Sequence, residues 1–241
     1  MGSATRPTPN PLAAGFYTVP DAARLIEVGN AQRIHGWLRG YPRSVVGPLM
    51  KRDFAPIDEQ EELSFLDLME VRAIEYFRAN GVKARTLRRA IEEARDILKT
   101  DHPFATAHIT FRADEKFIYI DEVLERSAKE EKDSLLYNLI RRSYESYTLI
   151  KETIGRGVEF DPRTHLPKTW RPRSEKFPNI VIDPLVSYGR PALPSGIATT
   201  TLFDAWLAEG KDYDEVAYWF EVPTTDVERA VAFEQEIARA A

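Results

Sequence analysis

Apolar residues recur at helical spacing in short segments near both ends of the chain. Near the start, Thr18 is expected to cap a short helix, residues 27–30 to form a turn, and Ala31–Arg39 to form a second helix. The stretch that follows, up to Phe54, is a candidate strand or wing. This pattern predicts a winged helix–turn–helix.

The middle of the chain combines longer helical patterns with short strand patterns. Ser64 is the expected cap of the first long helix, and the acidic run 58–62 before it is expected to act as a hinge. The expected elements are helices over Phe65–Ala79, Ala84–Leu98 and about 129–153, with β-hairpins over 107–120 and 158–170.

The end of the chain predicts a short strand at Ile180–Pro184 and then three helices, over about 200–208, 213–220 and 225–240. The fold class is therefore mainly α with small β-hairpins (α+β). The expected units are a disordered arm over 1–15, a helix–turn–helix unit over 16–56, a helical middle domain over 57–176, and a three-helix, homeodomain-like module over 177–241. The basic segment Arg171–Lys176 marks the last boundary.

Charge separates the two ends of the chain. Residues 1–56 hold seven Lys/Arg against three Asp/Glu, a net charge of +4, whereas residues 177–241 hold four against eleven, a net charge of −7. Because phosphate attracts cations, only the first unit is a credible DNA reader. The absence of cysteine and of any long apolar run predicts a cytoplasmic protein with no membrane contact.

In the DNA-reading interpretation, Ala31–Arg39 lies in the major groove. Side chains that the helix leaves exposed would reach base edges or phosphates. The expected DNA-binding residues are Gln32, Arg33, His35, Arg39 and Arg43, with Lys51 and Arg52 as further phosphate contacts. The alternative is a small helical hairpin with an ordinary solvated basic face.

The acidic C-terminal unit is expected to bind protein or to dimerise. It contains five large aromatic residues, Trp206, Tyr213, Tyr218, Trp219 and Phe233. Most are expected in the core, with one or two as interface anchors.

Catalytic patterns are weak, and no enzyme activity, cofactor or metal site is expected. His35, His102, His108 and His165 are scattered and lack the spacing of metal ligands. The glycine pair at 155 and 157 lacks the strand-then-helix setting of a phosphate loop.

Three segments resemble known families. Tyr17-Thr-Val-Pro-Asp-Ala-Ala-Arg-Leu-Ile with Ile34-His-Gly-Trp37 resembles the opening helix–turn–helix of MerR-like regulators. Leu63-Ser-Phe-Leu-Asp-Leu-Met-Glu-Val-Arg-Ala, followed by Leu87-Arg-Arg-Ala, resembles the middle of longer VapB-type antitoxins. The stretch from Ile180 through Phe220 to Val231 resembles the small trihelical module, of a family without assigned function, that ends those antitoxins. One departure is Gly189-Arg-Pro-Ala-Leu-Pro-Ser-Gly-Ile-Ala, which lacks the Thr-Arg of the usual motif.

The resemblance implies the antitoxin of a type II toxin–antitoxin system. Such a homodimer would neutralise a PIN-like ribonuclease toxin and repress the shared promoter by binding operator DNA. Because PIN-like nucleases hold a divalent cation in a carboxylate cluster, the antitoxin would offer that cluster a cation. The expected toxin-binding residues are Lys168, Arg171, Arg173, Lys176 and Arg190. The alternatives are a stand-alone MerR-like transcription regulator and an interaction scaffold without a DNA role.

Overall fold

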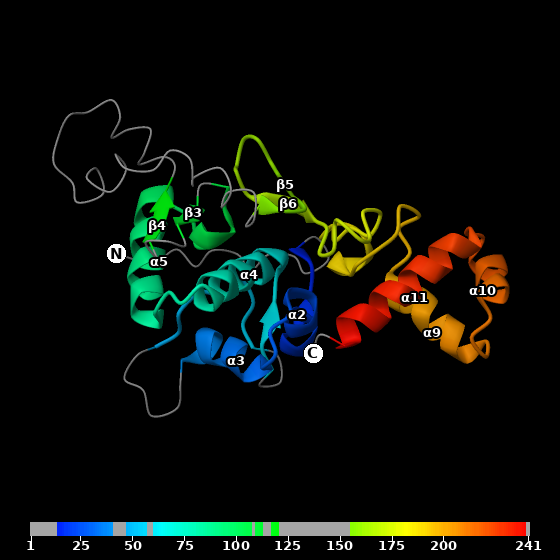
Figure 1. The fold of residues 1–241 in the computed structure, drawn as a ribbon. Helices are drawn as coiled ribbons and strands as arrows, with labels where there is room; N and C mark the ends of the chain where they lie inside the picture. The colour runs from blue at the N-terminus through cyan, green and yellow to red at the C-terminus, as the bar shows by residue number, and fades with distance from the viewer. Residues whose placement is uncertain are drawn as a thin grey trace.

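The computed structural model describes residues 14–40, 47–56, 60–107, 109–112, 117–120 and 155–239. Arg43, His108, most of the expected N-terminal arm and the expected helix over 129–153 lie outside these residues. The described part is mainly helical, with three two-stranded antiparallel sheets (Figure 1). The α+β class is therefore confirmed. Within the described segments, no helix is long and apolar enough to cross a membrane.

Two short helices open the described chain. Strand β1 (Tyr17–Thr18) leads into α2 (Val19–Ile26), and a turn connects α2 to α3 (Ala31–Arg39). The caps expected from the sequence form, since the side chains of Thr18 and Asn30 each accept a backbone N–H of the helix that follows. Residues 47–56 contain no strand, so the strand expected before Phe54 is not found there. Instead, β1 pairs with β2 (Glu62–Leu63).

The described part of the expected acidic hinge, residues 60–62, is not a free hinge. Glu61 and Glu62 are only 2% and 7% exposed. Glu62 lies in β2, and Glu61 pairs with Arg39 from α3. The hinge is expected from the acidic run before a helix N-terminus; the pairing of Glu62 in β2 and of Glu61 with Arg39 accounts for the burial.

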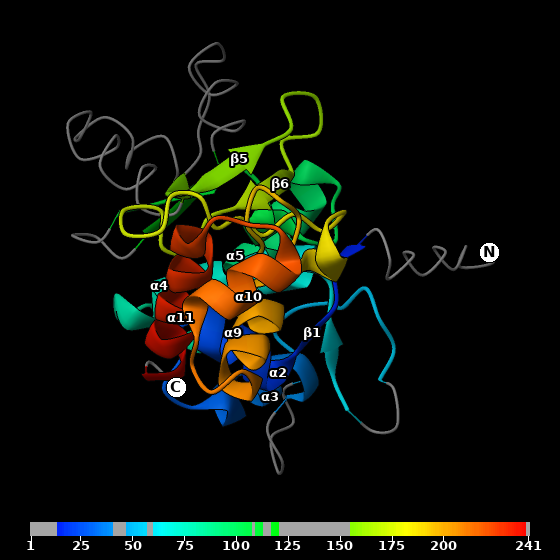
Figure 2. The same cartoon turned by 90° about the vertical axis from the view of Figure 1, so that its right-hand side faces the viewer.

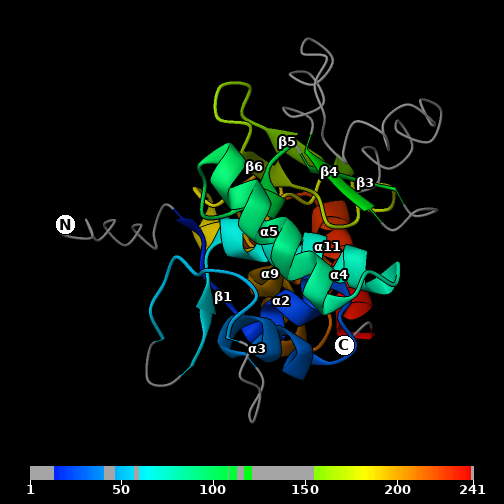
Figure 3. The ribbon, with the colours of Figure 1, turned by 90° about the vertical axis from the view of Figure 1, so that its left-hand side faces the viewer.

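The two long helices form as predicted, α4 over Phe65–Ala79 and α5 over Ala84–Leu98. Ser64 and Asp67 form a reciprocal capping box at the start of α4. The 3₁₀ turn η1 (Pro103–Ala105) packs against both helices. Figure 3 shows α4 and α5 from the side of α5. The expected hairpins also form, as β3 (Ile109–Arg112) with β4 (Phe117–Ile120) and β5 (Val158–Phe160) with β6 (Pro167–Trp170).

The C-terminal module consists of α9 (Thr199–Ala208), α10 (Tyr213–Phe220) and α11 (Thr224–Arg239), preceded by the short turn η2 (Ser187–Gly189). The three helices lie together in Figure 2, with α11 packed along α9. Leu202, Val227 and Phe233 are completely buried and belong to the hydrophobic core. At Ile180–Pro184 only isolated bridges form, from Val181 and Ile182.

The three units expected from the sequence share one hydrophobic core. At the junction between the first and last units, the hydroxyl of Tyr17 donates to the carbonyl of Gly189 at 2.7 Å. Arg173 is 14% exposed, pairs with Glu27 at 2.7 Å and donates to the carbonyl of Leu25. The segment 171–176, expected as a linker, is therefore packed against α2 rather than loose.

Candidate functional site

The arginines of α3 are engaged within the chain. The guanidinium of Arg33 lies 2.9 Å from the carboxylate of Glu75 on α4 and 5.6 Å from the ring of Trp37. Arg39, half exposed, pairs with the buried carboxylate of Glu61. Burial raises the pKa of Glu75 although Arg33 opposes the rise, so the ion pair offsets only part of the desolvation cost.

Gln32 and His35 complete the described part of the expected DNA-reading set. Gln32 is exposed at the start of α3. The Nδ1 atom of His35 lies 2.5 Å from Glu61 Oε2. Burial and the charge of Arg39 lower the pKa of His35 below its ordinary value, so at neutral pH it adds no positive charge to this face. Of the described readers on α3, Gln32 and Arg39 are exposed, and Arg39 is paired with Glu61.

The two further phosphate-contact residues lie on the loop 47–56. Lys51 is exposed and pairs with Asp101 at 2.7 Å. Arg52 is half-buried, and the negative charge of Asp67 acts on it. To meet DNA, Lys51 would have to leave the carboxylate of Asp101.

The expected toxin-binding cations divide into two groups. Arg173 and Lys176 both pair with Glu236 of α11, and Arg173 is also held by Glu27. Arg173 therefore connects α11 with the first unit.

The remaining cations are more available. Lys168 is exposed and makes a loose 3.7 Å contact with Glu159, also exposed. Within the described segments, Arg171 and Arg190 form no ion pair. Arg171 is half-buried and Arg190 is exposed, directly after η2.

The aromatic residues of the C-terminal module also divide. Trp206 and Phe233 are buried, whereas Tyr218 and Trp219 on α10 are 76% and 64% exposed. The exposed rings meet edge to face with centroids 5.9 Å apart, and Trp219 Nε1 donates to Glu215 at 2.8 Å. Tyr218 and Trp219 are therefore the candidates, within this module, for the interface anchors expected from the sequence.

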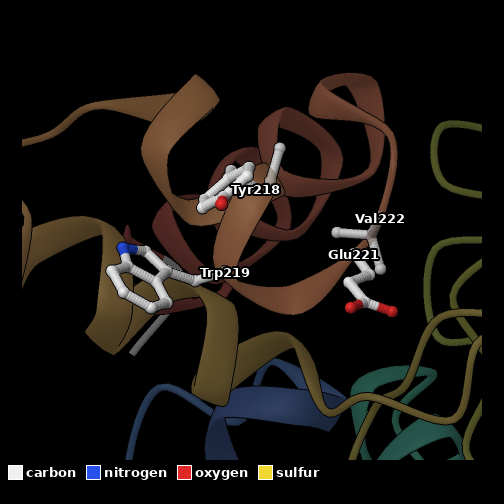
Figure 4. A pocket seen from close by; sticks show the side chains of 5 residues that line it. Tyr218, Trp219, Glu221 and Val222 are labelled. Carbon is white, nitrogen blue, oxygen red and sulfur yellow. The ribbon is translucent and has the colours of Figure 1, made fainter.

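These rings border an open depression of about 520 Å³ on the surface of α10. Figure 4 shows Trp219 and Tyr218 on one side of it and Glu221 and Val222 on the other. We call this surface, lined by Ala217, Tyr218, Trp219, Glu221 and Val222, the α10 patch. Exposed carboxylates lie on α10 and at its two ends, so the patch suits a partner with an apolar centre and a cationic rim. They are Asp212, Asp214, Glu215 and Glu221.

A second group of polar residues is buried where the loop 47–56, the start of α4 and η1 meet. We call Asp53, Asp67, Glu70 and His102 the buried polar cluster. His102 Nε2 lies 3.0 Å from Asp53, and Nδ1 lies 3.3 Å from Glu70 and 3.6 Å from Asp67. Asp67, Glu70 and His102 are 0%, 0% and 2% exposed.

Two members of the buried polar cluster, His102 and Asp67, have raised pKa values. Burial alone would lower the pKa of His102, but hydrogen bonds to Asp53 and Glu70 outweigh burial and raise it to about 10. Burial raises the pKa of Asp67 to about 6, against the effect of the His102 charge. Sequence spacing does not reveal this cluster, because its members are separated by up to 49 residues. The only local signal was the Ser64–Asp67 capping pair, which explains one carboxylate by itself.

Comparison with known proteins gives the fold. No family model and no curated protein matches the chain. The fold is similar to the X-ray crystal structure of Rv2018 from Mycobacterium tuberculosis, with a TM-score of 0.62 and 21% sequence identity. The match covers 92% of this chain and 98% of that one, so the likeness spans nearly the whole molecule.

Proposed function

We propose that the chain is the antitoxin of a type II toxin–antitoxin system. It binds a small PIN-like ribonuclease encoded beside it and represses the shared promoter through its N-terminal unit. The family resemblance of three segments suggested this function, and the distribution of exposed residues supports its protein-binding part.

The observation that carries the proposal is the exposure of Tyr218 and Trp219 on the α10 patch. A tryptophan that is not needed in the core leaves a large apolar surface in water, which is unfavourable unless a partner covers it. Aromatic residues of this kind anchor protein interfaces. The patch lies on an acidic module that phosphate would repel, so the partner is a protein rather than DNA.

A cation that reaches the nuclease's carboxylate cluster completes the inhibition. Arg190 and Arg171 are the best candidates, because neither forms an ion pair within the described segments. Arg173 and Lys176 would first have to leave Glu236. The proposed toxin contact therefore concentrates on Arg190, Arg171 and the exposed Lys168.

DNA reading rests on α2 and α3 acting as a helix–turn–helix. Gln32 contacts a base edge, and Arg33 and Arg39 exchange their carboxylate partners for phosphate or guanine. The exchange at Arg33 leaves the carboxylate of Glu75 without this cation, so the contact with DNA has to outweigh that loss. In a homodimer, two such units would address the half-sites of a palindrome.

The cation hypothesis is tested by charge reversal and an RNA-cleavage assay with the adjacent nuclease. Arg190→Glu and Arg171→Glu should each weaken inhibition by at least tenfold, because a carboxylate would then face the nuclease's acidic cluster. Arg163→Glu, on the exposed β5–β6 turn, is the matched control and should leave inhibition unchanged. If both reversals inhibit like wild type, the cation hypothesis is wrong.

A further inference from the structure

We infer that Asp53, Asp67 and His102 form a binding site for a divalent first-row transition-metal cation, with Glu70 as a positioning residue. Each of the three proposed ligands offers one donor atom, and these atoms all lie within 4.8 Å of one another. One imidazole nitrogen with carboxylate oxygens is a donor set that Zn²⁺ accepts, and Mn²⁺ tolerates it as well.

A separate observation points to a missing ligand. The Oδ1 atom of Asp67 is buried and has no hydrogen-bond partner within the described residues, although it lies 3.6 Å from His102 Nδ1. Its other oxygen, Oδ2, accepts the backbone N–H groups of Ser64 and Asp53. The carboxylate is therefore fixed by its backbone contacts with one oxygen left unsatisfied, an unfavourable arrangement that a cation would relieve.

The charge balance favours a divalent cation. Asp53, Asp67 and Glu70 bring three carboxylates, while His102 and the nearby Arg52 are the cations that act on them. Carboxylates gathered in a buried position repel one another, and a divalent cation between them would replace that repulsion by attraction.

The surroundings of His102 match those of a metal ligand. Glu70 Oε2 lies 3.3 Å from Nδ1 and so holds the ring with Nε2 directed toward Asp53. A carboxylate on the second ring nitrogen is the usual support of a metal-bound histidine. The side chain of Asp53 is 19% exposed, which gives a cation a path from solvent.

A bound cation would connect three pieces of chain. Asp53 belongs to the loop 47–56, Asp67 to the first turn of α4, and His102 directly precedes η1. The site is therefore structural: it would fasten the loop after α3 to the middle of the molecule. It is independent of the α10 patch and of the antitoxin proposal.

The test is calorimetric titration of the untagged full-length protein, freed of metal by chelator, with ZnCl₂ and separately with MnCl₂. We expect one equivalent of cation per chain for at least one metal, with a Kd below about 10 µM. Asp53→Asn should weaken binding at least tenfold, because it removes one charged ligand. The variant should still fold, because the side chain of Asp53 is partly exposed. Asp101→Asn is the matched control, since this carboxylate precedes His102 in the chain but pairs with Lys51.

Asp67→Asn provides a second variant, and circular dichroism of each variant checks its fold. X-ray absorption of the Zn²⁺-loaded protein should show one imidazole among oxygen ligands. The inference is overturned if the folded wild-type protein binds neither metal. It is equally overturned if both variants bind like wild type, since the cation would then lie elsewhere.

Discussion

Replacement of Trp219 by alanine should separate partner binding from folding. The side chain lies on α10 at the edge of the α10 patch, and the residue is 64% exposed. Within the chain it contacts Tyr218 and donates one exposed hydrogen bond to Glu215. Its removal should therefore change the free energy of unfolding by less than about 0.5 kcal/mol.

The effect on binding follows from the exposed area. A tryptophan side chain buries up to about 250 Å², so 64% exposure leaves on the order of 160 Å² for a partner to cover. At about 25 cal/mol per Å² the upper limit is about 4 kcal/mol. Since alanine keeps part of the contact and coverage is incomplete, we expect a loss of about 2–3 kcal/mol, roughly a 30- to 150-fold rise in Kd.

The assay is calorimetric titration of the adjacent nuclease with wild-type and variant protein. Leu185→Ala is the matched control, because Leu185 is 71% exposed but lies in the loop before η2. It should bind like wild type. An unchanged Kd for Trp219→Ala would refute the assignment of the α10 patch as the contact surface, and a collapse of the thermal transition would refute its description as a free surface.

Three further predictions concern the rest of the molecule. Arg33→Ala should weaken binding to the promoter, measured by fluorescence anisotropy, by about 1–3 kcal/mol. Glu75→Gln releases the guanidinium of Arg33 and should strengthen binding in the same assay. Weaker binding by Glu75→Gln would contradict the exchange of partners at Arg33. Because its pKa is raised to about 10, protonated His102 stabilises the fold fully below its unfolded pKa of about 6.5, and this stabilisation is lost as the pH rises to about 10. In the presence of chelator, the unfolding free energy of wild type should therefore fall more steeply from pH 7 to 10 than that of His102→Gln. Equal slopes would contradict this prediction. Gly189→Ala places a Cβ 2.3 Å from the Tyr17 hydroxyl at a φ of +80°, so it should lower the unfolding free energy by about 2–4 kcal/mol. Gly210→Ala, where φ is also positive but the space is open, should lower it by about 1 kcal/mol. Equal losses in chemical denaturation would contradict this prediction.

The sequence predicts the local elements well because their signals are local. The capping pair at Ser64 and Asp67 and the apolar spacing after it define α4, and the same reasoning locates α5 with the correct bounds. The aromatic content of the C-terminal module correctly raised the question of exposed anchors. Periodicity did not tell which aromatic residues would be exposed, because on a helix as short as α10 several faces carry large apolar residues.

Contacts between distant segments escape prediction. Arg33 and Arg39 follow a pattern typical of an exposed basic face, yet Glu75 and Glu61 from later elements neutralise them. Arg173 was expected in a linker, yet it is held between α2 and α11. In each case the partner is fixed by tertiary packing, which spacing along one chain does not encode.

Recovery of the proposed nuclease partner tests the antitoxin proposal most directly. The tagged full-length protein would be isolated from its own cells at native expression level, and the eluate quantified by mass spectrometry. We expect a small nuclease with a carboxylate cluster in stoichiometric amount, recovered with the wild-type protein and lost with Trp219→Ala. Recovery of this chain alone, from cells shown to express the adjacent gene, would contradict the antitoxin proposal and leave a DNA-binding regulator.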